Sequence, residues 1–568
     1  MEEIKAPWLD SYGDVPFHLD YSDRTMYGEV LCTAERYPKL NALSFMGRNI
    51  SYADMIKNTD IVARAFVAAG IRENDHVTVC MPNVPQTVYC LYALNKIGAV
   101  ASMIHPLSAE GEIDFYLRTA ESKCAVTLDQ FYTKFINVRK KYHLEKLVIT
   151  SVADELSPVK AMAFRIASKN PKVPAEDKET VLWKDFIRAG KEIPEVPVCN
   201  KKGTDPAVIL FSGGTTGTTK GIMLSNLNFN ALGKQTITMA NNFKPGMSML
   251  AAMPMFHGFG LGVCVHSMLI SGGRSILVPR FNVKSYGKLL KTEKPNYIAG
   301  VPTLYEAITR NPNMDGVDLS CLRGVFSGGD SLSIELKKKF DRFLAEHQAT
   351  VRVREGYGTT ECVTASCLTP YNKEKEGSIG LPYPDTYYKI CAVGTNTEVP
   401  YGEEGEICLS GPTVMLGYMN NEKETADTLK LHDDGRIWLH TGDLGLMDKE
   451  GFIYFKQRIK RMIVTSGYNV YPSQLENILD AHEAVMMSCV IGVKDPYKMQ
   501  KVKAFVVVKD GYTADDQLKE SIMEHCRKHI AKYAMPYDIE FRTELPKTLV
   551  GKVAYTVLEK EEAEKQTA

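Results

Sequence analysis

The stretch that decides the fold is AVILFSGGTTGTTKG, residues 207–221, in which a short apolar run opens into a loop of glycines and threonines. The apolar run predicts a buried strand. The glycines let backbone amides approach an anion, the threonine hydroxyls add donors, and Lys220 adds positive charge. The loop is not a Walker loop, because Thr218 and Thr219 separate Lys220 from the last glycine. It predicts a polyphosphate site, and a polar hairpin turn is the weaker alternative.

Short apolar runs separated by helix-like segments recur on both sides of this loop. Residues 76–81 and 98–104 have the character of strands, and residues 85–96 between them have helical apolar spacing. This pattern is typical of a βαβ unit. Similar runs lie at residues 207–211, 275–279, 297–300 and 322–326. The sequence therefore predicts an α/β architecture that contains parallel sheet.

The residue composition and the secondary-structure signals of the chain change in two places. Residues 157–202 are rich in Lys, Glu and Pro with little strand signal, which indicates a surface excursion. After Ile407, turn signals surround short β segments, and a charged run at residues 456–461 indicates a hinge. The remainder has strand signals near Val490 and at 502–508 and a helix signal at 514–532, which suits a small α+β domain.

Composition limits the classes of function. With 568 residues, of which 44% are hydrophobic, the chain holds more than one ordinary core, so at least two domains are expected. Lys plus Arg equals Asp plus Glu at 68 each, so no whole-molecule field draws the chain to nucleic acid. The 13 cysteines are odd in number and form no CxxC pair, which favours free thiols in the cytoplasm.

One uncharged stretch, residues 248–270, is about long enough to cross a bilayer. Pro254, His257, His266 and several glycines interrupt it, and no basic cluster flanks either end. We therefore expect a buried core segment and no transmembrane helix. Peripheral membrane contact and the oligomeric state stay open.

Three further motifs follow the loop: GYGTTE at residues 356–361, WLHTGD at 438–443 and LPKTLVGKV at 545–553. Together with the loop they resemble the signature motifs of the adenylate-forming superfamily of acyl-CoA synthetases, luciferases and peptide-synthetase adenylation domains. The chain departs from that pattern at Thr219, where proline is usual, at Gln457, where glycine is common, and at Tyr555, where many relatives have arginine. The resemblance implies ATP and CoA as substrates and Mg²⁺ as the metal.

The resemblance also implies the parts of a nucleotide site. The loop would hold the β and γ phosphates, the aromatic residue of GYGTTE would stack on adenine, its second threonine would contact the α-phosphate, and its glutamate would bind Mg²⁺. The aspartate of WLHTGD would accept from the ribose hydroxyls, and a following arginine would also bind ribose. The residues concerned are Ser212, Gly213, Gly214, Thr215, Thr216, Gly217, Thr218, Lys220, Tyr357, Gly358, Thr360, Glu361, Asp443 and Arg458.

Further assignments rest on the same resemblance. SGGDSL at residues 327–332 imitates a phosphopantetheine attachment site but follows a predicted strand, so Gly329 and Ser331 are assigned to the adenine pocket. His257 coincides with the acyl-site motif and is assigned to the carboxylate site or its gate. Lys552, in the last motif, is assigned to bridge the carboxylate and the α-phosphate during adenylation.

The resemblance implies a large N-terminal domain of α/β layers, residues 1–457, and a small mobile α+β C-terminal domain, residues 458–568, with Lys460 at the hinge. Since Lys220 and Lys552 belong to different domains, the site would be complete only when the domains close. A second closure would exchange Lys552 for the face that bears SGYN, residues 466–469, and admit a thiol.

The predicted reaction joins a carboxylic acid to AMP with release of pyrophosphate and then passes the acyl group to the CoA thiol. The uncharged residues 253–269 and the GVPTLY run at 300–305 indicate an apolar channel, which favours a medium- or long-chain fatty acid. Burial of each CH₂ is worth about 0.8 kcal/mol. The alternatives are an aryl-CoA ligase, an acyl-AMP ligase that loads a carrier protein and, in a different class, a nucleotide-binding protein without turnover.

Overall fold

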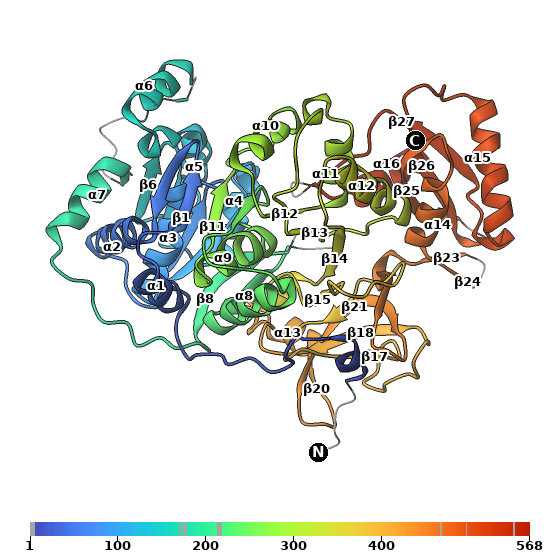
Figure 1. Cartoon of the computed structure of the whole chain (residues 1–568), viewed down its shortest axis with the longest axis horizontal. Helices are drawn as coiled ribbons and strands as arrows, with labels where there is room; N and C mark the ends of the chain where they lie inside the picture. The colour runs from blue at the N-terminus through green and yellow to red at the C-terminus, as the bar shows by residue number, and fades with distance from the viewer. Residues whose placement is uncertain are drawn as a thin grey trace.

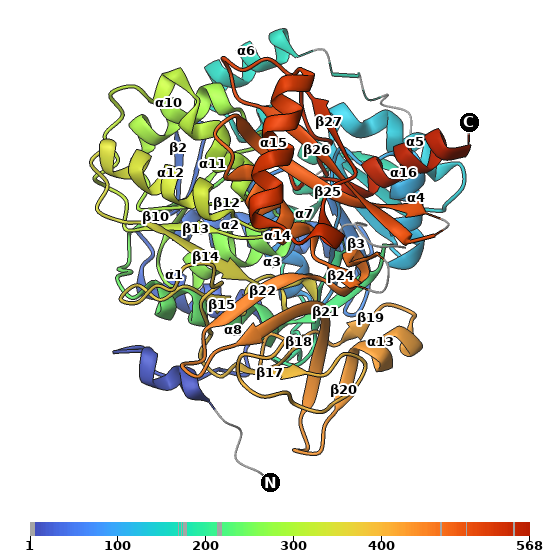
Figure 2. The same cartoon turned by 90° about the vertical axis from the view of Figure 1, so that its right-hand side faces the viewer.

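The computed structural model describes residues 6–168, 170–171, 173, 179–212, 219–465, 468–495, 497–548 and 551–567. Within these ranges the chain has the predicted α/β architecture. A large N-terminal domain carries three sheets and a smaller C-terminal domain carries a fourth (Figure 1). Figure 2 looks onto the C-terminal domain, which covers one side of the larger body.

Two sheets form the body of the large domain. The first contains the strand that precedes the phosphate loop. Its spatial order is β19 (Gly417–Tyr418), β9 (Gly221–Ser225), β8 (Pro206–Phe211), β4 (Val100–Met103), β3 (His76–Cys80), β5 (Cys124–Leu128), β6 (Lys146–Thr150) and β7 (Thr180–Leu182). The second runs β16 (Leu381–Pro382), β15 (Cys367–Leu368), β14 (Val353–Tyr357), β13 (Gly324–Ser327), β12 (Tyr297–Gly300), β10 (Ser248–Ala251), β11 (Arg274–Leu277), β1 (Asn41–Phe45) and β2 (Arg48–Ser51).

Two smaller sheets follow in the chain. The third has the order β17 (Tyr387–Cys391), β18 (Gly405–Ser410), β21 (Ile437–Met447) and β20 (Leu429–Leu431), with β22 (Ile453–Arg458) paired to β21. The fourth belongs to the C-terminal domain and has the order β24 (Tyr468–Val470), β23 (Ile463–Thr465), β26 (Met499–Val508) and β25 (Val485–Asp495), with β27 (Asp538–Arg542) paired to β26.

Helices separate and cover these sheets. They are α1 (Met26–Arg36), α2 (Tyr52–Ala68), α3 (Pro85–Lys96), α4 (Glu110–Thr119), α5 (Tyr132–Arg139), α6 (Pro158–Ala167), α7 (Trp183–Glu192), α8 (Asn226–Ala240), α9 (Ser267–Ile270), α10 (Val283–Glu293), α11 (Pro302–Thr309), α12 (Ile334–Glu346), α13 (Glu422–Thr428), α14 (Pro472–Asp480), α15 (Asp516–His529) and α16 (Tyr555–Thr567). Helices α1, α2, α3, α8 and α9 form a layer between the first two sheets, since α3 and α8 contact the first sheet and α2 and α9 the second. The two flanking sheets explain why α3 is buried on nearly every side, its polar residues Gln86, Thr87 and Asn95 included.

The predicted βαβ unit is confirmed by β3, α3 and β4, whose strands are parallel with Val77 opposite Ala101. The other four predicted runs correspond to β8, β11, β12 and β13, with small shifts at their ends. The C-terminal strand and helix predictions correspond to β25, β26 and α15. Parallel pairing of buried strands accounts for the continuous apolar runs that made these elements readable.

The prediction of a surface excursion at residues 157–202 is wrong in part. Strand β7 extends the first sheet beside β6, with Leu147 opposite Thr180. Helix α7 packs on α2 through Phe186, whose ring centroid lies 5.1 Å from that of Phe66. The helical apolar spacing of residues 183–190 was obscured by the charged residues on the other face of this amphipathic helix.

Most of residues 248–270 are buried, as predicted, and Pro254, Phe256, His257 and Ile270 are partly exposed. They form β10, a π-helix η4 (Phe259–His266) and α9, and every residue from Phe259 to Leu269 is buried. A π-helix of this length is rare and occurs mostly at functional sites. Among the residues that the structure describes, no helix is long and apolar enough to cross a membrane.

The N-terminal segment is bound to the third sheet and its neighbouring loops. Asp385 accepts hydrogen bonds from the Leu19 amide at 2.9 Å and the Tyr21 hydroxyl at 2.8 Å. Trp8 is fully buried beside Gly451, whose φ is +84°. A Cβ atom on Gly451 would lie 2.5 Å from the Trp8 backbone nitrogen. Only glycine satisfies both the backbone conformation and this close approach.

Replacing Gly451 by alanine should therefore destabilise the large domain. We expect a loss of about 2 to 4 kcal/mol, combining left-handed backbone strain with displacement of Trp8. Gly402 is the matched control, because its φ is +88° and no described atom lies within 4 Å of its Cβ position. Gly402→Ala should cost only about 1 kcal/mol. Urea unfolding followed by intrinsic fluorescence measures both, and equal losses would contradict the docking of Trp8.

Candidate active site

The motif residues converge where the second and third sheets meet the C-terminal domain. Tyr357 ends β14, and Glu361 lies in the short 3₁₀ helix η6 (Thr360–Cys362) that follows it. Asp443 and Arg458 come from the paired strands β21 and β22, where they lie opposite each other. Lys552 arrives from the C-terminal domain. Residues far apart in the sequence thus share one site because the strand ends meet there.

Asp443 is the buried centre of the site. Its side chain is 2% exposed, Arg458 Nε lies 3.2 Å from its Oδ1, and the Tyr357 hydroxyl donates to its Oδ2 at 2.7 Å. Burial raises the pKa of Asp443, while Arg458 and the Tyr357 hydroxyl act in the opposite direction. Its Oδ1 accepts no hydrogen bond from any described residue. This buried oxygen suits a ligand hydroxyl, as a ribose would offer.

Tyr357 supports Asp443 as well as offering an aromatic face. Burial raises the pKa of the Tyr357 hydroxyl well above its usual value, so it stays protonated and donates to Asp443. Its ring centroid lies 5.9 Å from that of Phe455 on β22. Gly358 allows the chain to turn away at once, since a Cβ there would lie 2.3 Å from the Thr364 carbonyl oxygen.

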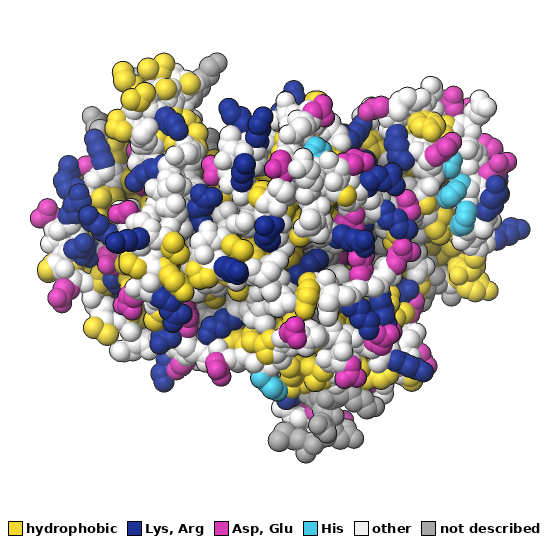
Figure 3. All heavy atoms as spheres, in the orientation of Figure 1, with side chains coloured by type: hydrophobic (Ala, Val, Ile, Leu, Met, Phe, Trp, Pro, Cys, Tyr) yellow, Lys and Arg dark blue, Asp and Glu magenta, His cyan; other side chains and the backbone are white. Residues whose placement is uncertain are grey.

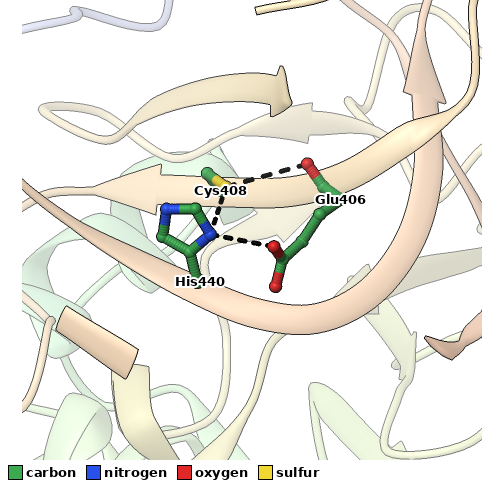
Figure 4. A group of neighbouring side chains, drawn as sticks. All are labelled: Glu406, Cys408 and His440. Atoms are coloured by element: carbon green, nitrogen blue, oxygen red, sulfur yellow. Dashed lines mark hydrogen bonds and ion pairs between the residues drawn. The ribbon is translucent and has the colours of Figure 1, made fainter. Parts of the chain in front are cut away.

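A group of buried side chains holds the strand just before Asp443 (Figure 4). His440 Nδ1 donates to Glu406 Oε2 at 2.8 Å, and the Gly442 amide donates to Glu406 Oε1 at 2.9 Å. Cys408 Sγ lies 3.5 Å from the same histidine nitrogen. Burial acts to raise the pKa of Glu406, but the hydrogen bonds from His440 and the Gly442 amide, together with the charges of His440 and Lys430, outweigh burial and lower the pKa. One carboxylate therefore fixes both the histidine and the bend that aims Asp443.

A strained turn follows Glu361. Val363 has φ +67° and ψ −54°, and the Thr364 amide donates to the Cys362 carbonyl at 2.9 Å, which together define a classic γ-turn. The carbonyl of Val363 packs on Gly258, where a Cβ would lie only 1.7 Å from it. Strain of this kind concentrates at functional sites. The contact between Val363 and Gly258 joins the turn that carries Thr360 and Glu361 to the segment that carries His257.

Glu361 and Lys220 are linked through residues that the motifs do not contain. The Tyr418 hydroxyl donates to Glu361 Oε1 at 2.9 Å. Lys220 Nζ lies 4.7 Å from the centre of the Tyr418 ring and forms a close ion pair with Glu424 on α13. The hydrogen bond from Lys220 lowers the pKa of Glu424. Tyr418 and Glu424 were missed by sequence reasoning, because no motif spacing relates them to residue 220.

The base of the phosphate loop is closed by its two ends. The Ser212 amide donates to the Lys220 carbonyl at 3.1 Å, and the Lys220 amide donates to Ser212 Oγ at 3.0 Å. The remaining predicted loop residues lie outside the described residues. These are Gly213, Gly214, Thr215, Thr216, Gly217 and Thr218.

Lys552 comes from the C-terminal domain and lies beside the large domain's carboxylates. A Cβ on Gly329 would lie 3.5 Å from Lys552 Cε. Burial lowers the pKa of Lys552, while the nearby Asp330, Asp443 and Glu361 act to raise it. The turn is docked by Thr303 Oγ1, which donates to the Gly551 carbonyl at 2.9 Å. The GVPTLY run, predicted to line an acyl channel, thus contacts the Lys552 turn through Thr303.

The connection between the domains is short. Strand β22 of the third sheet ends at Arg458, the 3₁₀ helix η7 (Ile459–Arg461) follows, and β23 of the fourth sheet begins at Ile463. Lys460 is exposed within η7. Arg461 forms a close ion pair with Glu476, and its guanidinium lies 4.6 Å from the centre of the Tyr555 ring. Tyr555 therefore anchors the start of α16, just after Lys552, through a cation–π contact.

A narrow cavity adjoins the site. It has a volume of about 30 Å³, enough for about two water molecules. Gly329 belongs to its wall, whereas Ser331 is exposed and lies outside the lining. His257 precedes η4, which contributes Phe259 and Val263 to the wall, and burial together with Lys552 lowers the pKa of His257 to about 3. The full lining is Thr236, Phe259, Val263, Phe326, Ser327, Gly328, Gly329, Gly356, Thr364, Ala365, Leu368 and Tyr383.

Known proteins match this chain over nearly its whole length. Family models for the AMP-binding enzyme and for the AMP-binding enzyme C-terminal domain match residues 32–419 and 474–552. The chain is 35% identical to a long-chain-fatty-acid–CoA ligase of Bacillus subtilis (strain 168), covering 99% of each chain, and 32% identical to one of Yersinia pestis, covering 99% of this chain and 98% of that one.

Solved structures resemble the chain as well. ATP-bound MatB from Rhodopseudomonas palustris has a TM-score of 0.81 at 25% identity, and apo MatB has a TM-score of 0.72 at 24% identity. Both comparisons cover 95% of this chain and 99% of the other. The two family models match in sequence order, and the relatives match over nearly their full length. The fold of the solved structures agrees with both findings. The chain therefore belongs to the AMP-binding enzyme family.

Proposed function

We propose that this protein is an ATP-dependent acid:CoA ligase that adenylates a medium- or long-chain fatty acid and then transfers the acyl group to CoA. The observation that carries the proposal is the docking of the Lys552 turn on the large domain, where Lys552 Cε lies beside Gly329 and the Thr303 hydroxyl donates to the Gly551 carbonyl. The curated relatives, which are long-chain-fatty-acid–CoA ligases matched over nearly their whole length, support the acid and the acceptor.

In the first half-reaction, a carboxylate oxygen attacks the α-phosphorus of ATP and pyrophosphate leaves. Both reactants are anions, so catalysis requires positive charge between them. Lys552 would supply it as an ammonium that contacts both anions. Asp443 Oδ1 would accept from ribose, and Lys220 would exchange Glu424 for the β and γ phosphates. This exchange of partners keeps the Lys220 charge compensated before and after ATP binds.

The donor set also suits Mg²⁺, because Glu361 offers a hard carboxylate oxygen beside the proposed path of the phosphates. Bound by Glu361 and phosphate oxygens, the metal would offset negative charge on the leaving pyrophosphate. Thr360 would donate to the α-phosphate from the same turn. The γ-turn at Val363 would hold both side chains in place.

The second half-reaction requires a different face of the C-terminal domain. We propose Lys460 in η7 as the hinge and residues 1–457 and 458–568 as the moving bodies. The polar, local docking of the Lys552 turn on Thr303 supports a contact that breaks readily. The greater likeness to ATP-bound than to apo MatB supports assignment of the present arrangement to the adenylation state.

The acyl chain would enter along η4. The cavity is too small for a fatty chain in its present form, so Phe259 and Val263 would have to move apart. His257, kept neutral by burial, would act as a gate next to the carboxylate.

We propose a cytoplasmic location, which is supported by all thirteen cysteines being free thiols.

The proposal is tested first by acid-dependent ATP–pyrophosphate exchange with fatty, aromatic and amino acids. We expect exchange with medium- and long-chain fatty acids and thioester formation when CoA is added. Exchange confined to aromatic acids would favour an aryl-CoA ligase, and exchange without thioester would favour a carrier-loading enzyme. Absence of exchange with every acid would refute enzyme function.

Lys552→Ala should lower the exchange rate by roughly 10²- to 10³-fold, because it removes a charge aimed at the transition state. Lys547→Ala is the matched control, since Lys547 is an exposed lysine in the same hairpin, which is bridged to Val553. It should change the rate less than about twofold. Thioester formation from added acyl adenylate should survive in both variants. Equal loss in the two half-reactions would contradict a role limited to adenylation.

The rate of exchange should also fall at alkaline pH. Burial lowers the pKa of Lys552 below its ordinary value of 10.5, so the ammonium loses its proton, and its charge, earlier than a free lysine does as pH rises. Lys552→Arg retains its charge throughout this range. We therefore measure pH–rate profiles of pyrophosphate exchange for both proteins. The alkaline midpoint of the Lys552→Arg profile should lie at higher pH than that of the unmodified enzyme. Identical alkaline midpoints would exclude Lys552 as the titrating group.

A further inference from the structure

Helix α11 turns two faces towards different parts of the molecule. One face is buried in the core of the large domain through Leu304, Tyr305 and Ile308. The other face meets the C-terminal domain through Thr303 and through Arg310, which caps the helix. These two residues lie close to two helical turns apart, so they share one face at a spacing of about 10 Å. Figure 1 places α11 at the boundary between the domains.

Arg310 binds one end of a pair of strands in the C-terminal domain. Its Nη2 donates to Asp510 Oδ2 at 2.5 Å, and its Nη1 makes a close contact with the Met486 sulfur. Met486 lies near the start of β25 and Asp510 just after the end of β26, where Val485 is opposite Val508. Within the described ranges, the polar partners of this guanidinium all belong to the C-terminal domain. Its contacts therefore serve the docking of one domain on the other.

The two contacts of this face fix different aspects of the docking. The hydrogen bond from Thr303 holds the Lys552 turn, but a contact confined to one turn does not by itself fix the rotation of a domain. A second contact two helical turns away does fix it. Glu306, between them on the same face, is bound by Lys339 of α12 at 2.9 Å and is thereby compensated within the large domain. Figure 3 shows basic and acidic side chains interspersed at this boundary, right of centre.

The ion pair has the strength that a reversible contact requires. An exposed pair contributes little to the stability of a folded domain, and here the Arg310 side chain is 38% exposed and that of Asp510 91%. Between two domain arrangements of similar free energy, however, even a small contribution changes the populations severalfold. The pair is therefore suited to biasing a domain movement.

We propose that Arg310 is a positioning residue for adenylation, because its contacts with Asp510 and Met486 fix the rotation of the C-terminal domain at which Lys552 enters the active site. The inference rests on the proposed function, in which the second half-reaction uses another face of this domain. The turn to that face would break both contacts. Arg310 would therefore favour the first half-reaction and leave the second unaided.

The first test compares the two half-reactions. Arg310→Gln should lower the rate of acid-dependent pyrophosphate exchange by roughly two- to fivefold. Thioester formation from added acyl adenylate should be at least as fast as in the unmodified enzyme. Asp510→Asn should give the same pattern, the double variant should be no slower than either single variant, and Arg310→Lys should retain most of the exchange rate. The matched control is Arg342→Gln, which removes an exposed arginine of α12 and should leave both rates unchanged.

The second test needs no turnover. Undocking of the C-terminal domain should loosen the connection between the domains, so trypsin should cleave Arg310→Gln at Lys460 at least roughly twofold faster than Arg342→Gln. Each variant loses one tryptic site, which makes the two digests comparable, and thermal unfolding should be the same in both. Equal cleavage rates would overturn the inference, as would equal loss in the two half-reactions. Absence of exchange in the unmodified enzyme would instead refute the proposed function, and the cleavage rates would still decide whether Arg310 docks the domain.

Discussion

The arrangement of the site depends on one charge, the ammonium of Lys552, which the C-terminal domain brings to a half-buried position beside Gly329 of the large domain. Burial lowers the pKa of Lys552 there, and the charges of Asp330, Asp443 and Glu361 act to raise it. Removing an ammonium from water is costly unless opposite charges compensate it. The carboxylates that compensate it belong to the large domain, so the lysine is stable there only while the domains are together. A substrate carboxylate and phosphates would compensate the same charge, which links occupancy of the site to closure.

The large domain supplies the rigid half of the site. Glu406 receives hydrogen bonds from His440 and Gly442 and so fixes the bend before Asp443. The γ-turn at Val363 stores backbone strain that packing against Gly258 maintains. The C-terminal domain, in contrast, has two hydrogen-bond contacts with this framework among the described residues near Lys552: the Gly551 carbonyl accepts from the Thr303 hydroxyl, and the Val553 amide makes a long contact with Asp330. A rigid large-domain framework and a weakly docked Lys552 turn suit a reaction whose two half-reactions use two domain arrangements.

Two features indicate that substrate entry changes the protein. Lys220 is paired with Glu424, so the proposed contact with a polyphosphate requires the phosphates to replace Glu424 in that ion pair. The cavity behind η4 is narrow, so the proposed route for an acyl chain requires the side chains that line the cavity to move apart. The irregular hydrogen bonding of a π-helix makes η4 an apt place for such movement. At the end of the molecule away from the C-terminal domain (Figure 1), α6 exposes apolar side chains that no described part of the chain covers.

The sequence by itself determined the α/β class, the βαβ unit at 76–104 and the motif positions, because parallel strands buried on both faces and phosphate-binding turns impose composition on short segments. It also singled out Tyr357, Asp443 and Lys552, each inside such a motif. Only the tertiary structure decided that Tyr418 and Glu424 hold Lys220, that Ser331 faces solvent, and that α6 turns its apolar face outward. Those outcomes depend on strand register and on packing between distant segments, which no local spacing encodes.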